Sequence, residues 1–322
     1  MHVEVRHARV VAAVAREGSI SGGAARLGLP QPSVTAQLRR IERAMGGDLF
    51  VRSHAGVVPT PLGERLIPLF VDLARRADVV VAEAAVRDTE VLRIGNTEWT
   101  PAPLRDALQA SLPRVEMQTE TTESAAALTA VRRGVLSAAL VFGTGDELLD
   151  AADRQGLLHE VIFREPVWLA VPHGHPLAAS DIVGLRQLRA VRWVRLAKEH
   201  WFAGAEKQLF ARFGDTPPEV VHHAGGHAEA MSWVRDAGVA AWANPTGATA
   251  EVDLIPVRTS VQVRLLLVWR LGAISRATAT ALVESVRLYY TDYARTRPRY
   301  WTWMAANRAE FTELARYLPH PR

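Results

Sequence analysis

The sequence contains no cysteine among its 322 residues. A chain without cysteine forms no disulfide, offers no thiol nucleophile and binds no zinc through sulfur. Sensing of oxidants by thiol chemistry is excluded for the same reason. Whatever this protein recognises, it recognises with other side chains.

Long apolar runs are absent as well, since none reaches the roughly 20 residues that a helix needs to cross a bilayer. The amino terminus, MHVEVRHARV, also lacks the charged-then-apolar pattern of a secretory signal. We therefore expect a cytoplasmic protein with no membrane partner.

The signatures of three common enzyme classes are missing: the G-x-S-x-G elbow, the P-loop and the G-x-G-x-x-G fingerprint. We therefore expect no enzymatic activity, no catalytic residue and no cofactor.

Lysine is scarce, because Lys198 and Lys207 are the only two and arginine supplies the other cations. Residues 1–52 contain eight arginines and four carboxylates, so their net charge of +4 equals that of the whole chain. A surplus of positive charge concentrated in one segment favours a nucleic-acid partner, although solvated surface charge is the common explanation of any such surplus.

That basic segment has the pattern of two short helices. Ser19–Leu27 places small and apolar residues on one side of a helix, and Gly-Leu-Pro then ends it. A second helix is predicted from Gln31, because apolar residues recur there at helical spacing. They are Val34, Leu38 and Ile41. Two helices joined by a tight turn, the second with a polar and basic face, are typical of a helix-turn-helix that reads the major groove.

A hairpin wing is predicted after the second helix, from extended segments at residues 49–52 and 56–59. Wings lie along the phosphate backbone, where Arg52 would position the domain; the alternative for Arg52 is an ordinary surface charge. We expect the polar side chains of the second helix to read bases and its arginines to bind phosphates. The predicted DNA-binding residues are Ser21, Gln31, Pro32, Ser33, Thr35, Gln37, Arg39, Arg40 and Arg52.

This part of the chain resembles the amino-terminal domain of the LysR-type transcriptional regulators. The positions that carry the resemblance are Arg6-His7, 11–18, Ser19, Ala24-Ala25, Leu27, Gln31-Pro32, Gln37-Leu38, Ile41-Glu42, Leu49-Phe50, Arg52 and 60–63. The resemblance implies a regulator that binds double-stranded operator DNA and whose activity a small-molecule effector modulates. A small-molecule binding protein with a vestigial helix-turn-helix is the alternative, and an enzyme is a more distant one.

The chain departs from the family pattern at three places. Gly22-Gly23 stands where the family usually has Thr-Arg, and Ala36 replaces a residue that is often basic. Pro30 stands where the family usually has Ser and has no side-chain oxygen for a helix cap. We therefore expect a weak cap, or one that moves to Gln31 with Pro32 at the first helical position.

A long helix is predicted to follow, opened by Thr60 as cap and Pro61 at the first position, with a kink at Pro68. Its apolar residues are spaced almost as in a coiled-coil seam. They are Leu62, Leu66, Leu69, Leu73, Ala77, Val80 and Ala84. In the family this helix pairs with that of a second subunit, so we expect a homodimer or homotetramer; packing of the seam on its own domain is the alternative.

From residue 91 the pattern changes to strands alternating with helices, in the order βαβαβ of a parallel sheet. Further resemblance, in LRIG at 92–95 and in Glu165–Ala178, implies the family's effector domain: two α/β lobes, similar to periplasmic binding proteins, with a ligand cleft between them. The fold class is thus α/β, with a winged helix-turn-helix and a linker helix in front. We predict the divisions 1–60 (winged helix-turn-helix), 61–90 (linker helix), 91–295 (effector domain, lobe one at 91–164 and 264–295, lobe two at 165–263) and 296–322 (helical extension).

Polar residues follow the first two strands of this domain, where parallel sheets bind ligands and helix amino termini present N–H groups. Glu98 and Glu123 lie beside them and would repel a simple carboxylate, which favours a neutral or amphoteric effector, and Trp99 suggests room for an aromatic part. Helix capping is the alternative role of the hydroxyls. The predicted effector-binding residues are Asn96, Thr97, Thr122, Ser124, Trp201 and His227.

Two histidine-rich segments, 173–175 and 222–227, invite a metal site. No cysteine and no well-spaced carboxylate completes a ligand set in either, so we expect no metal. The tail has apolar residues that suggest an amphipathic helix, which packs on its own lobe or, alternatively, contacts another subunit. They are Trp301, Met304, Phe311, Leu314 and Leu318.

Overall fold

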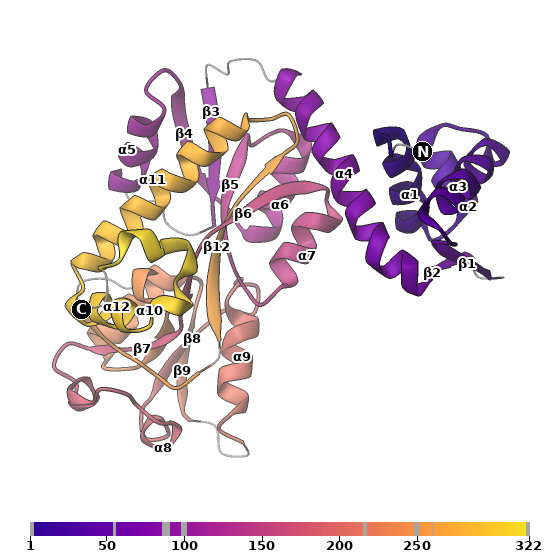
Figure 1. The fold of residues 1–322 in the computed structure, drawn as a ribbon. Coiled ribbons are helices and arrows are strands. Elements are labelled where there is room, and N and C mark those ends of the chain that lie inside the picture. The colour runs from indigo at the N-terminus through magenta and orange to yellow at the C-terminus, as the bar shows by residue number, and fades with distance from the viewer. Residues whose placement is uncertain are drawn as a thin grey trace. The chain divides into compact units, whose positions relative to one another are not determined.

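The computed structural model in Figure 1 describes residues 3–53, 56–85, 91–97, 102–214, 218–247, 251–259 and 261–319. The chain forms two compact units, Met1–Val86 and Arg87–Arg322. None of the helices in the described ranges combines the length and the apolar character needed to span a membrane.

The first unit is a winged helix-turn-helix followed by a long helix. Its elements are α1 (Val5–Glu17), α2 (Ile20–Leu27), α3 (Gln31–Met45), β1 (Phe50–Ser53), β2 (Gly56–Pro59) and α4 (Pro61–Ala85). The apolar stripe of α3 is buried as predicted, in one core with α1, α2 and α4. β1 and β2 pair antiparallel, with Phe50 opposite Pro59, and form the expected wing.

Two outcomes were expected at the start of α3: a weak cap, or a cap that moves to Gln31. Pro30 is itself the residue before the helix, and its carbonyl accepts from the N–H groups of Ser33 and Val34 at 3.0 and 3.2 Å. No side chain caps the helix, and Pro32 is the second helical residue rather than the first. The cap is therefore weak, and the expected shift to Gln31 is wrong because Pro30 already has the extended conformation of a cap residue.

Helix α2 packs on α1 at a point where only glycine fits. A Cβ on Gly23 would meet the Cγ2 of Val14 at 2.9 Å and its backbone nitrogen at 3.0 Å. Ser19 meanwhile caps α2 by accepting from the N–H of Gly22 at 3.1 Å. Gly23 is thus the residue that lets the first two helices of this unit approach each other.

We expect Gly23→Ala to destabilise the first unit. Alanine gains about 1 kcal/mol of helix propensity over glycine, but overpacking against the backbone of Val14 costs about 1–3 kcal/mol. Chemical unfolding of the full-length protein should therefore show a lower midpoint for the amino-terminal transition. Ser21→Ala, at an exposed position of the same helix, should stay within about 0.5 kcal/mol of wild type. A Gly23→Ala midpoint at or above that of wild type would contradict the close contact.

Helix α4 presents apolar residues to two sides. Ile67, Phe70 and Ala74 are buried in the core of the first unit, where Leu62 and Leu66 are partly buried beside them. Leu69 and Val80, by contrast, are 65% and 70% exposed. The predicted seam is therefore divided: its first two residues pack on their own unit, contrary to expectation, because the buried face of α4 is wide enough to include them.

The second unit begins with a five-stranded mixed sheet, the first lobe. Its strands are β3 (Val91–Asn96), β4 (Glu116–Thr121), β5 (Ala138–Thr144), β6 (Leu157–Pro166) and β12 (Gln262–Arg270), in the order β4-β3-β5-β12-β6. β3 is parallel to β4 and β5 as predicted, whereas β12 is antiparallel to β5 and β6. The helices of this lobe are α5 (Ala102–Ser111), α6 (Ser124–Arg133), α7 (Glu147–Arg154) and α11 (Arg276–Arg295).

The second lobe lies between β6 and β12 in the sequence. Its strands are β7 (Trp168–Pro172), β8 (Trp193–Leu196), β9 (Val220–Ala224), β10 (Ala241–Ala243) and β11 (Val252–Ile255), in two small sheets, β10-β7-β11 and β8-β9. Its helices are η1 (Pro176–Ala179), α8 (Leu185–Leu188), α9 (Ala203–Ala211), α10 (His227–Ala237) and η2 (Pro245–Gly247).

The tail forms one short helix and two 3₁₀ turns instead of the single amphipathic helix expected. They are α12 (Pro298–Ala306), η3 (Arg308–Glu310) and η4 (Thr312–Tyr317). The α-helix ends at Asn307, whose amide donates to the carbonyl of Trp303. The apolar residues after the break are nevertheless buried in the core of the second unit.

Candidate DNA-binding surface and effector site

The outward face of α3 carries the side chains that were predicted to bind DNA. Gln31, Arg39 and Arg40 are exposed, like Pro32, and the polar residues between them are partly exposed. These partly exposed residues are Ser33, Thr35 and Gln37. The amide of Gln37 donates to the hydroxyl of Ser33, one turn earlier, at 3.4 Å. The structure thus brings donors and cations together on one face, opposite the buried stripe.

The single carboxylate of α3 points the other way. Glu42 is 8% exposed, and its Oε1 accepts from the N–H groups of Leu49 and Phe50 at 3.0 and 3.3 Å. Glu42 therefore fixes the start of the wing to the helix and leaves no carboxylate of α3 on the outward face of the helix. This role was missed, although the position of Glu42 directly after Ile41 of the apolar stripe could have indicated it.

Two further predicted DNA contacts lie beside α3. Ser21 is exposed in the first turn of α2. Arg52 lies on β1, but its side chain is outside the described residues, as are residues 54 and 55. Both remain predictions.

The predicted effector residues of the first lobe meet where β3, β4 and β5 end. Asn96 and Thr97 are 2% and 8% exposed, and the carbonyl of Asn96 accepts from the N–H of Thr122 at 2.9 Å. Ser124 is the first residue of α6 and is partly exposed. The four side chains thus lie at the carboxyl edge of the sheet, as expected.

Two of these hydroxyls bind the end of β5. The N–H of Phe142 donates to Oγ1 of Thr97 at 2.9 Å, and the hydroxyl of Ser124 donates to the carbonyl of Phe142 at 3.1 Å. Helix capping, the alternative role, does not describe these hydroxyls. The N-cap of α6 is Glu123, and no side chain accepts a hydrogen bond from the free N–H groups at the start of that helix. A hydroxyl near a strand end can bond to the neighbouring strand as well as to a helix, and the sequence does not separate the two.

Residues of the second lobe reach the same place through an aromatic contact. The rings of Trp201 and Phe142 are stacked, with centroids 5.5 Å apart and planes 21° apart. His227, the first residue of α10, lies 5.9 Å from the ring of Trp201, and the rings of His200 and Phe202 complete the cluster. Trp201 and His227 therefore belong with the first-lobe candidates, and Phe142 is the residue that joins them.

Phe142 was not predicted to be part of the site. It lies near the end of β5, one of the strands of the predicted βαβαβ order, so it lies at the same sheet edge as Asn96 and Thr122. That topological position was the available signal. Of the other residues discussed for this site, Glu123 is exposed, whereas Glu98 and Trp99 lie outside the described residues.

An ion pair joins Arg195, which is 26% exposed, to the buried carboxylate of Glu206 in the second lobe. The carboxylate of Glu206 accepts from Nε of Arg195 at 3.1 Å and from the N–H of Leu196. Burial raises the pKa of the Glu206 carboxyl, and the charge of Arg195 offsets part of that rise.

The histidine-rich segments have structural partners. His173 contacts Asp253 at 3.1 Å, and Nδ1 of His175 accepts from the N–H of Leu177. His222 contacts Glu229 at 2.9 Å and stacks on Trp233. Within the described ranges, no group of three or more His, Asp and Glu side chains is placed to hold a metal ion.

Two family models cover most of the chain. Residues 5–64 match the bacterial regulatory helix-turn-helix protein, lysR family, and residues 88–289 match the LysR substrate binding domain. The chain belongs to the LysR family. It is a DNA-binding transcriptional regulator with an effector-binding domain, as the resemblance implied.

Relatives of this LysR regulator align over nearly its whole length. It is 31% identical over 318 residues to the small neutral protease regulatory protein of Streptomyces coelicolor, covering 94% of this chain and 92% of the relative. The protein of the same name from Streptomyces lividans is also 31% identical, with coverages of 94% and 87%.

Solved structures share the fold at lower identity. A hydrogen-peroxide-bound cysteine mutant of OxyR from Corynebacterium glutamicum is 19% identical with a TM-score of 0.51, covering 89% of this chain and 94% of that one. HinK, a LysR family regulator from Pseudomonas aeruginosa, is 18% identical with a TM-score of 0.50 and coverages of 88% and 97%. These likenesses support the architecture of the LysR chain and not its ligand.

We expect Thr97→Val to destabilise the effector domain of this LysR protein even without an effector. Valine keeps the shape of threonine but leaves the buried N–H of Phe142 without its acceptor, which costs about 1–3 kcal/mol. Urea unfolding monitored by circular dichroism measures the loss. Thr129→Val serves as the control, since the hydroxyl of Thr129 bonds to Ala125 within α6, and it should stay within about 0.5 kcal/mol. Equal stabilities of the two variants would show that the Thr97 bond is not structural.

Proposed function

We propose that this protein acts in the cytoplasm as a homodimeric or homotetrameric regulator that binds operator DNA with α3 in the major groove. Gln31, Ser33, Thr35 and Gln37 would contact base edges, with Ser21 and Pro32 beside them. Arg39, Arg40 and Arg52 would bind phosphates. In this proposal the protein works by binding alone and catalyses no reaction.

The observation that carries this proposal is the composition of the exposed face of α3. Every charge on that face is positive, because the one carboxylate of the helix, Glu42, is turned inward to the wing. The wing and the helix are thereby held in one fixed orientation for binding DNA. A vestigial helix-turn-helix would have no need for a buried carboxylate that positions its wing.

We further propose that a small organic effector binds where the aromatic stack of Phe142 and Trp201 meets Asn96, Thr97, Thr122, Ser124 and His227. The stack supports a ligand with a planar part, since a ring can lie against either face. Glu123 is exposed beside this position, which favours a neutral or amphoteric ligand over a simple carboxylate.

The DNA-binding mode predicts different effects for Gln31→Ala and Arg40→Ala. Gln31→Ala should weaken binding to a site selected from random DNA by about 1–3 kcal/mol, with little effect on non-specific DNA. Arg40→Ala should weaken both and lower the slope of log affinity against log salt by about 1. Fluorescence anisotropy at several salt concentrations measures both quantities.

The control for this experiment is Arg75→Ala, which removes an exposed arginine of α4 that pairs with Asp72. It should change neither the affinity for the selected site nor the salt slope. If Gln31→Ala weakened specific and non-specific binding equally, the base-reading role of Gln31 would be wrong.

We propose that the exposed apolar residues of α4 form the subunit interface. Leu69, Leu73 and Val80 lie on one side of the helix and are 36% to 70% exposed. A row of large apolar side chains in water favours pairing with a second copy of the helix.

We expect Leu69→Glu combined with Val80→Glu to reduce the oligomer mass in light scattering. Operator affinity should fall by roughly 10²–10⁴, because a single half-site loses the avidity of the pair. Val71→Glu is the matched control, since Val71 is also exposed but lies about 200° around the helix from Leu69. Leu66 is unsuitable because it packs on its own core. An unchanged mass in the double variant would place the interface elsewhere.

A further inference from the structure

The tail after α11 contacts both lobes of the effector domain. In Figure 1 it appears in yellow, with α12 beside β7 of the second lobe, while η4 packs on β6 of the first lobe. Both lobe-to-lobe connections of the chain, β6 to β7 and β11 to β12, lie elsewhere in the sequence. The tail is therefore a third link between the lobes.

Arg299 fastens the tail to the second lobe. Its guanidinium donates to the carbonyls of Ala178 and Asp181 at 3.1 and 3.0 Å, and also to that of Ser180. Three carbonyls from one short segment fix a planar guanidinium in orientation as well as in position. The ring of Trp168 on β7 packs edge-on against Tyr300 and Trp303 at 5.5 and 5.6 Å.

Glu165 joins the tail to the point where the chain passes between the lobes. It lies near the end of β6, is 1% exposed, and accepts from the amide of Asn244 at 2.6 Å. Thr246 donates to it through both its N–H and its hydroxyl, and the hydroxyl of Tyr300 donates at 3.4 Å. One buried carboxylate therefore holds the crossover, the second lobe and the tail together. A buried carboxylate that loses some of its hydrogen bonds is costly in free energy, so Glu165 opposes separation of the segments that it joins.

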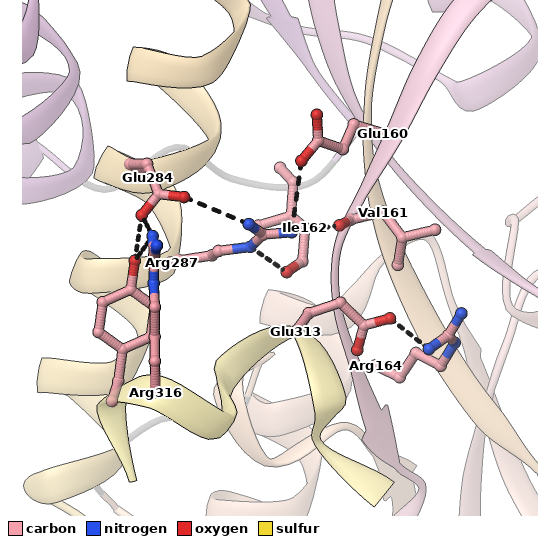
Figure 2. A network of polar contacts seen from close by, with 9 residues as sticks. Glu160, Val161, Ile162, Arg164, Glu284, Arg287, Glu313 and Arg316 are labelled. Atoms are coloured by element: carbon pink, nitrogen blue, oxygen red, sulfur yellow. Dashed lines mark hydrogen bonds and ion pairs between the residues drawn. The ribbon is translucent and has the colours of Figure 1, made fainter.

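The first lobe holds the other end of the tail, as Figure 2 shows. Glu313 of η4 pairs with Arg164 of β6, and Glu284 of α11 pairs with Arg316. Arg287 of α11 donates to the carbonyls of Val161 and Ile162, both at 2.8 Å. Strand β6, helix α11 and the end of the tail thus form one bonded layer.

Apolar packing agrees with these polar contacts. Four tail residues besides Tyr300 are 1% to 3% exposed, and they share one continuous core with residues of both lobes. They are Met304, Phe311, Leu314 and Leu318. The core that they complete includes Phe163 of the first lobe and Trp168 of the second.

We propose that residues 296–319 are a clamp that holds the two lobes at one closure angle. A ligand shifts a conformational equilibrium only by its difference in affinity for the two states. An effector that favoured another angle would first have to displace the contacts of Arg299, Glu165 and Glu313. The clamp therefore biases the domain to a single lobe arrangement, whether or not an effector is bound.

The test is the distribution of distances between the lobes, measured by pulsed electron spin resonance on the full-length protein. Because the natural chain has no cysteine, Arg132→Cys in the first lobe and Lys207→Cys in the second place one spin label on each. Mixing with excess unlabelled chain removes distances between subunits. We expect a narrow distribution in this background, and about two-fold broadening when either anchor is removed by Arg299→Ala or by Glu313→Gln.

Arg295→Ala is the control, since the contacts of Arg295 with Asp292 and with the ring of Trp301 lie within α11 and the tail. Circular dichroism and affinity for non-specific DNA show whether each variant is folded, and the isosteric Glu313→Gln keeps the test valid if Arg299→Ala does not fold. A distribution as narrow as that of the control in a folded anchor variant would overturn the clamp. This outcome is independent of the proposed effector site, because no effector is added.

Discussion

Strand β12 completes the sheet of the first lobe, although the whole second lobe precedes it in the sequence. It pairs on one side with β5 and on the other with β6, and its residues from Val263 to Val268 are almost entirely buried. Without β12, β5 would be an open edge and β6 would have no partner in this sheet. The sheet of the first lobe therefore depends on a pairing between segments about a hundred residues apart, which is slow to form.

The two units use buried carboxylates in the same way. Glu42 holds the wing to α3, Glu206 holds β8 to α9, and Glu165 holds the crossover to the tail. Each accepts N–H or O–H groups from another element, seven to ten residues away for Glu42 and Glu206 and far along the chain for Glu165, so each fixes the position of the segment that it contacts. For Glu165 and Glu206, burial raises the pKa of the carboxyl, so these bonds form against a desolvation cost.

Local patterns in the sequence were sufficient to predict the helices of the DNA-binding unit and the first three strands of the first lobe, β3, β4 and β5. The stripe of Val34, Leu38 and Ile41 is buried because helical periodicity alone decides which face packs. Patterns were insufficient where one residue type serves two purposes. Leu66 and Leu69 occupy equivalent positions in the predicted seam. Leu66 is nevertheless partly buried against the core of its unit, whereas Leu69 is exposed. Only the width of that core determines this difference.

The site shows the same limit. Thr97 and Ser124 were located correctly at the edge of the sheet, but their hydroxyls bond to Phe142 of a third strand, and that contact exists only after β5 is inserted beside β3. The contact between Phe142 and Trp201 joins residues of different lobes and has no counterpart in any local spacing. Contacts of this kind depend on tertiary structure, which periodicity does not record.

The second lobe occupies one uninterrupted segment between β6 and β12, which suggests a cassette that could be exchanged between related proteins. The tail changes that expectation. Arg299 and Tyr300 lie far along the chain, yet they bond to η1 and to the crossover at Glu165. The segment that can be exchanged is therefore discontinuous in sequence. A chimera that takes its second lobe from another protein must also take the tail from that protein, or the contacts between the second lobe and the tail will not fit.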